Sequence, residues 1–183
     1  MAHEQQKQFC ERVKLQHPTF FVNKKVLDVG SLDINGNNRF LFEEGTYTGI
    51  DIGEGINVDI VSLAHEFNAP DKSFDVIIST ECFEHDLHYA KSIENIVRML
   101  SDGGMFLFTC ASIGRAEHGT TRSDQGVNAP LLSNHGEWGD YYKNLNEQDI
   151  RAVLDVDGIF SEYHFEYEPD AYDLYFWGIK KEK

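Results

Sequence analysis

The apolar stretch KVLDVG (25–30) predicts a buried β-strand that ends at a glycine, and the polar stretch GSLDINGNN (30–38) continues from it. Further short apolar stretches follow along the chain: YTGIDI (47–52), NVDIV (57–61), FDVIIS (74–79) and MFLFTC (105–110). Runs of this length and composition are typical of strands that are covered on both faces of a parallel sheet. The chain therefore predicts a sheet whose central strands are fully buried.

Helical segments separate these strands. Apolar residues in 90–100 recur at helical spacing, so one face of that segment is apolar. We expect further helices at 5–16 and 37–44, and one that Asn146 caps and Gly158 ends. Alternating strands and helices favour a parallel sheet. Strands at 162–167 and 174–179 are joined by too short a connection for a crossover helix, so that pair is antiparallel. The expected fold is a three-layer α/β/α sandwich with a mostly parallel seven-stranded sheet and an antiparallel last strand.

Length and charge narrow the class of protein. The 183 residues predict a single domain over 1–183, in which 1–22 form a leading helical segment. With 16 Lys and Arg against 31 Asp and Glu, the net charge is −15, which disfavours nucleic acids and anionic membranes as partners. The chain has neither an apolar run of membrane-spanning length nor a signal-like N-terminus, which favours a cytoplasmic location. Three widely spaced cysteines indicate neither a disulfide framework nor a zinc knuckle.

Acidic residues stand near the ends of three predicted strands: Asp28, Asp51 and Asp59. Because ligands bind beyond the carboxyl ends of the strands in such sheets, we expect these carboxylates to face one crevice, although each alone would also suit a helix cap. The loop after the first strand lacks the GxGxxG spacing that a dinucleotide pyrophosphate requires. This favours a ligand with a ribose and an adenine but without a phosphate.

Four motifs together resemble class I S-adenosylmethionine-dependent methyltransferases, in the small-molecule, methyltransferase type 11-like branch: VLDVGSLDINGNNR (26–39), YTGIDIGEGINVDIV (47–61), FDVIISTECFEH (74–85) and RMLSDGGMFLFTC (98–110). The resemblance covers roughly residues 20–180. It implies a Rossmann-like fold and S-adenosylmethionine as cofactor. The loop DVGSLDING departs from the glycine-rich DxGxGxG that is common in this family.

The resemblance also implies roles for individual residues in cofactor binding. Asp28, with the backbone of Gly30 and Ser31, would hold the amino-acid moiety, and Asp51 would accept both ribose hydroxyls. For the remaining contacts the expected residues are Ile52 against the adenine face, Asp59 at the adenine amino group, the Ile60 amide at the ring, and Thr80 and Glu81 beside the methyl group. Three carboxylates suit a cationic sulfonium ligand.

The segment 112–144 has no periodicity and is too long for an idle connection, which favours a substrate lid. We expect Arg115, Trp138, Tyr141 and Tyr142 to contact the acceptor substrate. The alternative is that the aromatic residues only pin this segment to the core.

His85 directly follows the fourth strand's motif, so we expect it nearest the transferred methyl group, as a general base or as an orienting hydrogen-bond partner. His118 is the second catalytic candidate, and helix capping is the alternative role for His85. The stretch FEHDLH (83–88), with His118 and His135, also raises a divalent-metal site. We expect no metal, because the histidine spacing falls in a loop and magnesium prefers carboxylates.

The leading hypothesis is therefore methyl transfer from S-adenosylmethionine to an oxygen or nitrogen of a small-molecule acceptor. A non-catalytic or regulatory domain that binds the same cofactor is the alternative, and the first loop argues against a nucleotide-dependent oxidoreductase.

Overall fold

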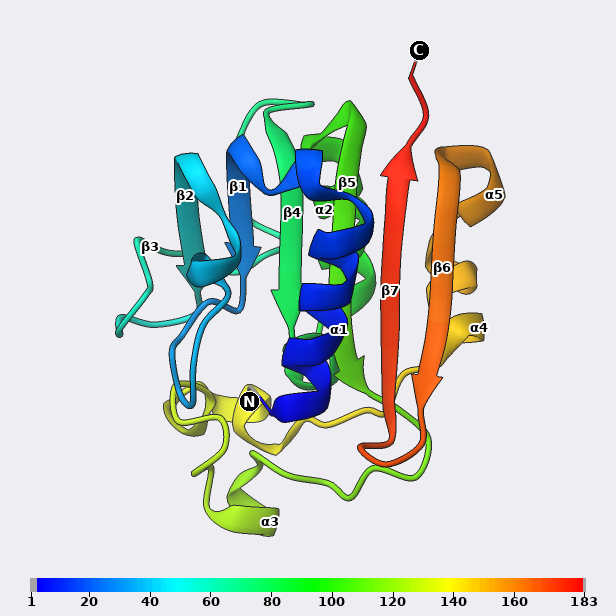
Figure 1. The fold of residues 1–183 in the computed structure, drawn as a ribbon. Coiled ribbons are helices and arrows are strands. Elements are labelled where there is room, and N and C mark those ends of the chain that lie inside the picture. Colours follow the sequence, from blue (N-terminus) through cyan, green and yellow to red (C-terminus); the bar gives the residue numbers. More distant parts are fainter. Residues whose placement is uncertain (1–2, 183) are drawn as a thin grey trace.

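The computed structural model describes residues 3–182; Met1, Ala2 and Lys183, which the expected domain includes, lie outside the described residues. A seven-stranded sheet in the order β3-β2-β1-β4-β5-β7-β6 forms its centre (Figure 1). The strands are β1 (Val22–Val29), β2 (Glu43–Asp51), β3 (Ile60–Val61), β4 (Phe74–Thr80), β5 (Leu100–Ala111), β6 (Phe160–Glu168) and β7 (Asp173–Lys180). The helices are α1 (Glu4–Gln16), α2 (Tyr89–Met99), α3 (Thr121–Asp124), α4 (Glu147–Val153) and α5 (Val156–Ile159).

Strands β1 to β5 pair in parallel, and β7 pairs antiparallel with both β5 and β6. The expected fold class, including the antiparallel last strand, is confirmed. Strands β1 and β4 are neighbours in the middle of the sheet. From β1 the strands β2 and β3 follow toward one edge, and from β4 the later strands follow toward the other, so the strand order reverses between β1 and β4. In open sheets of this kind the reversal opens a crevice at the carboxyl ends of the strands.

The two faces of the sheet are covered by different helices. Helix α1 lies across one face, where Phe9 stacks on Tyr175 with 4.6 Å between ring centroids. Helices α2, α4 and α5 lie on the opposite face (Figure 1), where Ile93, Ile96 and Ile150 are buried in the larger apolar cluster. The leading helix expected from the sequence is therefore a structural layer of the sandwich.

Two local expectations are wrong. The segment 37–44 contains only a 3-10 turn, Arg39–Leu41, because Glu43 already pairs with Val22 in the sheet. The helix that Asn146 caps ends at Val153, before Gly158. A separate short helix, α5, begins after Asp155, whose side chain accepts the Gly158 amide.

The irregular segment 112–144 has internal order. It contains α3 and two 3-10 turns, Leu132–Asn134 and Gly136–Asp140. The Asp124 carboxylate accepts hydrogen bonds from the amides of Gly119 and Gly126 and from the Asn128 side chain. Across residues 3–182, none of the helices has both the length and the apolarity needed to cross a bilayer.

Candidate functional site

A cleft of about 950 Å³, counted to its open mouth, lies at the carboxyl ends of β1, β2 and β4. Its walls come from loops after these strands and from the irregular segment. The lining residues are Asp28 to Leu32, Ile34, Gly36 to Asn38, Ile50 to Ile52, Ser62 to Ala64, Thr80 to Cys82, His85, Asp86, Asn128 to Leu132 and Trp138.

Gly30 and Cys82 form the floor of the cleft between β1 and β4. Gly30 has a φ of +77°, and its amide and that of Ser31 both donate to the Ile50 carbonyl. A Cβ on residue 30 would lie 2.5 Å from the Cys82 Sγ. The turn after β1 therefore requires glycine at position 30, both for its backbone conformation and for space.

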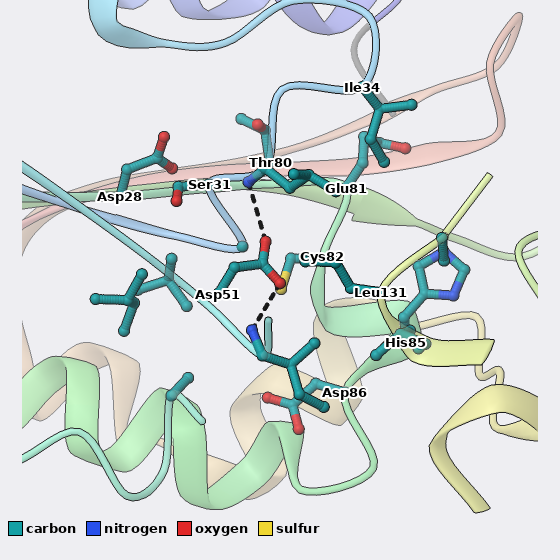
Figure 2. Close-up of a pocket in the computed structure, with 18 of the residues that line it drawn as sticks. Asp28, Ser31, Ile34, Asp51, Thr80, Glu81, Cys82, His85, Asp86 and Leu131 are labelled. Carbon is teal, nitrogen blue, oxygen red and sulfur yellow. Dashed lines mark hydrogen bonds between the residues drawn. The ribbon is translucent and has the colours of Figure 1, made fainter. Parts of the chain in front are cut away.

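Asp51 ends β2 with its carboxylate held by backbone amides (Figure 2). Its Oδ2 accepts from Leu32 at 3.0 Å, and its Oδ1 accepts from Ile52 at 2.7 Å. Burial raises the pKa of Asp51, although both amide hydrogen bonds oppose this shift. A carboxylate has about four lone-pair positions, so two remain for hydroxyl donors in the cleft.

Asp28 lies on β1, also in the wall of the cleft. Its Oδ2 accepts from the Tyr47 hydroxyl at 2.5 Å, and its Oδ1 is buried with no hydrogen-bond partner among residues 3–182. Burial raises the pKa of Asp28 to about 7, and the hydrogen bond from Tyr47 opposes the shift. The free oxygen is therefore suited to a cationic donor.

The structure places Asp59 and Ile60 outside the cleft, contrary to the expected adenine contacts. The Asp59 carboxylate accepts from the Gly49 amide at 2.7 Å and from Arg39 at 2.8 Å, and its side chain is 45% exposed. Strand β3 is only two residues long, and the residues that reach the cleft come directly after it. Ser62, Leu63 and Ala64 line the wall that Asp59 and Ile60 were expected to form.

His85 is buried in the 3-10 turn Phe83–His85 and lines the cleft. Its ring meets that of His118 edge to face, with 5.0 Å between centroids, and that of Tyr142 at 5.4 Å. Burial and then the neighbouring His118 lower the pKa of His85 to about 3. His118 itself lies behind His85 and is not a lining residue. The two catalytic candidates are thus brought together, but only His85 faces the cleft.

Glu81 follows β4 at a φ of +52° and belongs to a buried charged cluster beside the cleft. His3 lies 2.7 Å from an Asp173 oxygen and 3.8 Å from a Glu81 oxygen. Arg115 donates to Asp173 at 3.2 Å and to the Ala171 carbonyl. Arg115 is therefore a partner of Asp173 and does not line the cleft, contrary to its expected role at the acceptor.

Of the other residues expected at the acceptor, only Trp138 lines the cleft. Tyr142 packs on His85 and His118, and Tyr141 lies in neither the lining nor this ring cluster. Residues 128–132, which no sequence motif singled out, also line the cleft. Leu131 reaches across to Gly53, where a Cβ would lie 3.2 Å from its Cδ2. In the sequence, only the length of the irregular segment 112–144 indicated that these residues belong to a binding site.

A family model for the methyltransferase domain matches residues 1–146. The chain belongs to this methyltransferase domain family. The resemblance to the methyltransferase family that the sequence motifs indicated is therefore confirmed. No curated protein sequence matches this methyltransferase.

Solved structures of similar fold include several methyltransferases. Phosphoethanolamine N-methyltransferase 2 of Haemonchus contortus is 17% identical, with a TM-score of 0.64 over 96% of this chain and 53% of its own. The chain thus spans about half the length of that enzyme. The 1,6-didemethyltoxoflavin-N1-methyltransferase of Burkholderia thailandensis is 14% identical, with a TM-score of 0.65 over 97% of this chain and 79% of its own. A SAM-dependent methyltransferase of Aquifex aeolicus is 16% identical, with a TM-score of 0.61 over 93% and 89%.

Proposed function

We propose that the chain transfers the methyl group of S-adenosylmethionine to an oxygen or nitrogen of a small-molecule acceptor. One observation carries the proposal. Of the nine residues expected to bind the cofactor, seven line a single cleft: Asp28, Gly30, Ser31, Asp51, Ile52, Thr80 and Glu81. Their positions at the ends of β1, β2 and β4 agree with the site expected for this sheet topology.

The residues present fit the cofactor at both of its polar ends. Asp51 is held by two amides and keeps lone pairs for the ribose hydroxyls. Asp28 offers a buried oxygen that has no partner among the described residues, which suits the ammonium group of the amino-acid moiety. The carboxylates of Asp28, Asp51 and Glu81 together favour a cation over an anion in this cleft. The adenine wall then consists of Ile52 and residues 62–64.

S-adenosylmethionine supplies an electrophilic methyl group on a sulfonium. The acceptor's lone pair forms the new bond to carbon while the carbon–sulfur bonding pair returns to sulfur, which yields S-adenosylhomocysteine. Such a displacement depends on alignment, so the chain's main tasks are to position both reactants and to exclude water. His85 lines the cleft, and because burial lowers its pKa to about 3 it is a weak base, so its role is to orient the acceptor by a hydrogen bond. Phosphoethanolamine and didemethyltoxoflavin N-methyltransferases of the same fold support a small acceptor.

The segment 112–144 acts as the lid of this site. Residues 128–132 and Trp138 line the cleft, and Leu131 spans it to Gly53. A closed lid strengthens electrostatic contacts inside the cleft and keeps water from the reacting atoms. The single domain over 1–183, the cytoplasmic location and the lack of a nucleic-acid or membrane partner stay predictions.

Calorimetry and label transfer test the proposal together. We expect S-adenosylmethionine and S-adenosylhomocysteine to bind, and NAD not to bind. Methyl-labelled cofactor, incubated with panels of small amines, phenols and alcohols, should label a member of one panel. Tight NAD binding without S-adenosylhomocysteine binding would overturn the proposal. Cofactor binding with no labelled product in any panel would favour the non-catalytic alternative.

A further inference from the structure

Behind the acceptor end of the cleft, Glu84, His85 and His118 form a cluster that the proposed methyl transfer does not explain. Each side chain contributes one potential ligand atom, and these atoms all lie within 4.8 Å of one another. Glu84 has 0% and His85 6% of its surface exposed. The residues come from the 3-10 turn after β4 and from the irregular segment after β5, so only the tertiary fold brings them together.

Four polar atoms of this cluster have no hydrogen-bond partner among residues 3–182. Both carboxylate oxygens of Glu84, the Nδ1 of His85 and the Nε2 of His118 are buried and unpaired within that range. His118 Nε2 lies 4.0 Å from Glu84 Oε1, which is too long for a hydrogen bond. An ionised carboxylate buried without a partner costs roughly several kcal/mol by desolvation, and a bound cation would offset this cost.

His118 is oriented as metal-binding histidines commonly are. Its Nδ1 lies 3.1 Å from the Ala116 carbonyl, to which it donates, and the Tyr142 hydroxyl lies 3.2 Å from the same nitrogen. A backbone carbonyl at Nδ1 fixes the tautomer in which Nε2 carries a free lone pair. That lone pair is on the nitrogen nearer Glu84.

We propose that Glu84, His85 and His118 bind one divalent transition-metal ion, such as Zn²⁺, at the wall of the cleft. Two imidazoles and a carboxylate form a donor set that suits zinc or iron(II), whereas magnesium and calcium prefer oxygen donors alone. Bond lengths of ~2.0–2.2 Å place tetrahedral ligands roughly 3.3–3.6 Å apart, so shifts of about 1 Å would close the cluster on the ion.

A second cluster of potential metal ligands in the fold differs from this one, because it contains charged partners from the protein itself. His3, Glu81 and Asp173 also hold their ligand atoms within 4.8 Å. There, His3 already pairs with Asp173 at 2.7 Å, and Arg115 pairs with Asp173 at 3.2 Å. Asp173 thus has two cationic partners, and Glu81, whose oxygens also lack hydrogen-bond partners among the described residues, lies 3.8 Å from His3. This cluster already contains cations of the protein itself, unlike the cluster at Glu84.

Three protein ligands leave at least one coordination position for water or for a substrate atom. An imidazole binds metal through one nitrogen and keeps the other, so His85 can hold the ion and still present a nitrogen to the cleft. The metal site does not depend on the proposed methyl transfer, since its ligands and its test are separate from cofactor binding.

Cobalt binding tests the site on the full chain. After dialysis against a chelator, we expect one Co²⁺ per chain to give the visible absorption bands of a four- or five-coordinate ion, and one Zn²⁺ to displace it. Glu84→Gln and His118→Gln should each weaken Zn²⁺ binding at least 10²-fold in competition with a chromophoric chelator. His135→Gln is the matched control, because His135 is an exposed histidine of the same segment.

Absence of the cobalt bands in the folded native chain would overturn the proposal without any variant. So would a Zn²⁺ affinity that His118→Gln and His135→Gln lower equally. Circular dichroism shows whether each variant is folded, and calorimetry with S-adenosylhomocysteine on the same samples reports the cofactor site separately. If the native chain gives the cobalt bands but does not bind S-adenosylhomocysteine, only the methyltransferase proposal is contradicted.

Discussion

Gly30 and Cys82 meet so closely at the floor of the cleft that a Cβ on residue 30 would lie 2.5 Å from the Cys82 Sγ and 2.6 Å from its Cβ. Gly30 also has a φ of +77°, which a residue with a Cβ adopts at a cost of about 1–2 kcal/mol. The turn after β1 and the turn after β4 therefore constrain each other, and this contact sets the shape of the cofactor site.

Gly30→Ala should lower the free energy of unfolding by about 2–4 kcal/mol, because it adds a steric clash to the backbone strain. Urea denaturation measures the loss. Cys82→Gly removes the clashing atoms, so the double variant should lose less than the two single variants added together. Strictly additive losses would mean that the clash relaxes elsewhere and that the two turns are independent.

Asp51→Ala should weaken S-adenosylmethionine binding by about 2–3 kcal/mol, because the ribose loses its charge-assisted acceptor. Calorimetry on folded protein measures the change. Asp59→Ala is the matched control: it removes a carboxylate on the neighbouring loop that pairs with Arg39 outside the cleft. Equal losses in the two variants, or no loss in Asp51→Ala, would contradict the assignment of the ribose to Asp51.

Cofactor affinity should fall as the pH drops below about 7, because burial raises the pKa of Asp28 to about 7. Below this pH the carboxyl is protonated and loses its attraction for an ammonium group, whereas above it the carboxylate is ionised. Linkage predicts affinity about 30-fold lower at pH 5.5 than at pH 8. Asp28→Asn keeps an acceptor for Tyr47 and should flatten this profile, so an unchanged slope would assign the titration to another group.

The lid should change its dynamics on binding. Hydrogen exchange across 112–144 should be fast in the free protein and slow only with S-adenosylhomocysteine and acceptor together, because closure needs both. The acceptor is the one that the labelling panels identify. Slow exchange throughout this segment in the free protein would mean that Trp138 and its neighbours are a permanent part of the core.

The ion pair between His3 and Asp173 should stabilise the fold in a defined pH range. Burial alone would lower the pKa of His3, but the nearby carboxylates of Asp173 and Glu81 outweigh it and raise the pKa to about 9. Because the folded-state pKa exceeds the usual 6.5, this stability is fully present below pH 6.5 and is lost as the pH rises through 9.

His3→Gln should therefore cost about 1.5–3 kcal/mol at pH 6 and much less at pH 10, measured as free energies of unfolding in urea. Lys14→Gln serves as the control, since it removes a cation from the other end of α1 that pairs with the largely exposed Glu43. A cost of His3→Gln that does not change with pH would mean that the histidine acts only by packing.

By itself, the sequence determined the sheet, the strand ends and the family. Strands such as 74–79 and 105–110 are continuous apolar runs, and their alternation with amphipathic segments permits few topologies. Asp51 was predictable as a cleft residue because it stands where a strand ends, and strand ends are set locally. The cap at Asn146 was predictable for the same reason, since its side chain bonds only to amides two and three residues ahead.

Only the tertiary structure decided which polar side chains meet. Asp59 has the sequence signature of a cleft acid, yet Arg39 and the Gly49 amide hold it outside the cleft. His118 and Arg115 lie in a segment without periodicity, so no repeat in the sequence specifies that one packs on His85 and the other pairs with Asp173. Contacts of this kind depend on how a long loop crosses back over the sheet. They form, and stabilise the protein, only after the sheet has brought the contacting residues close together.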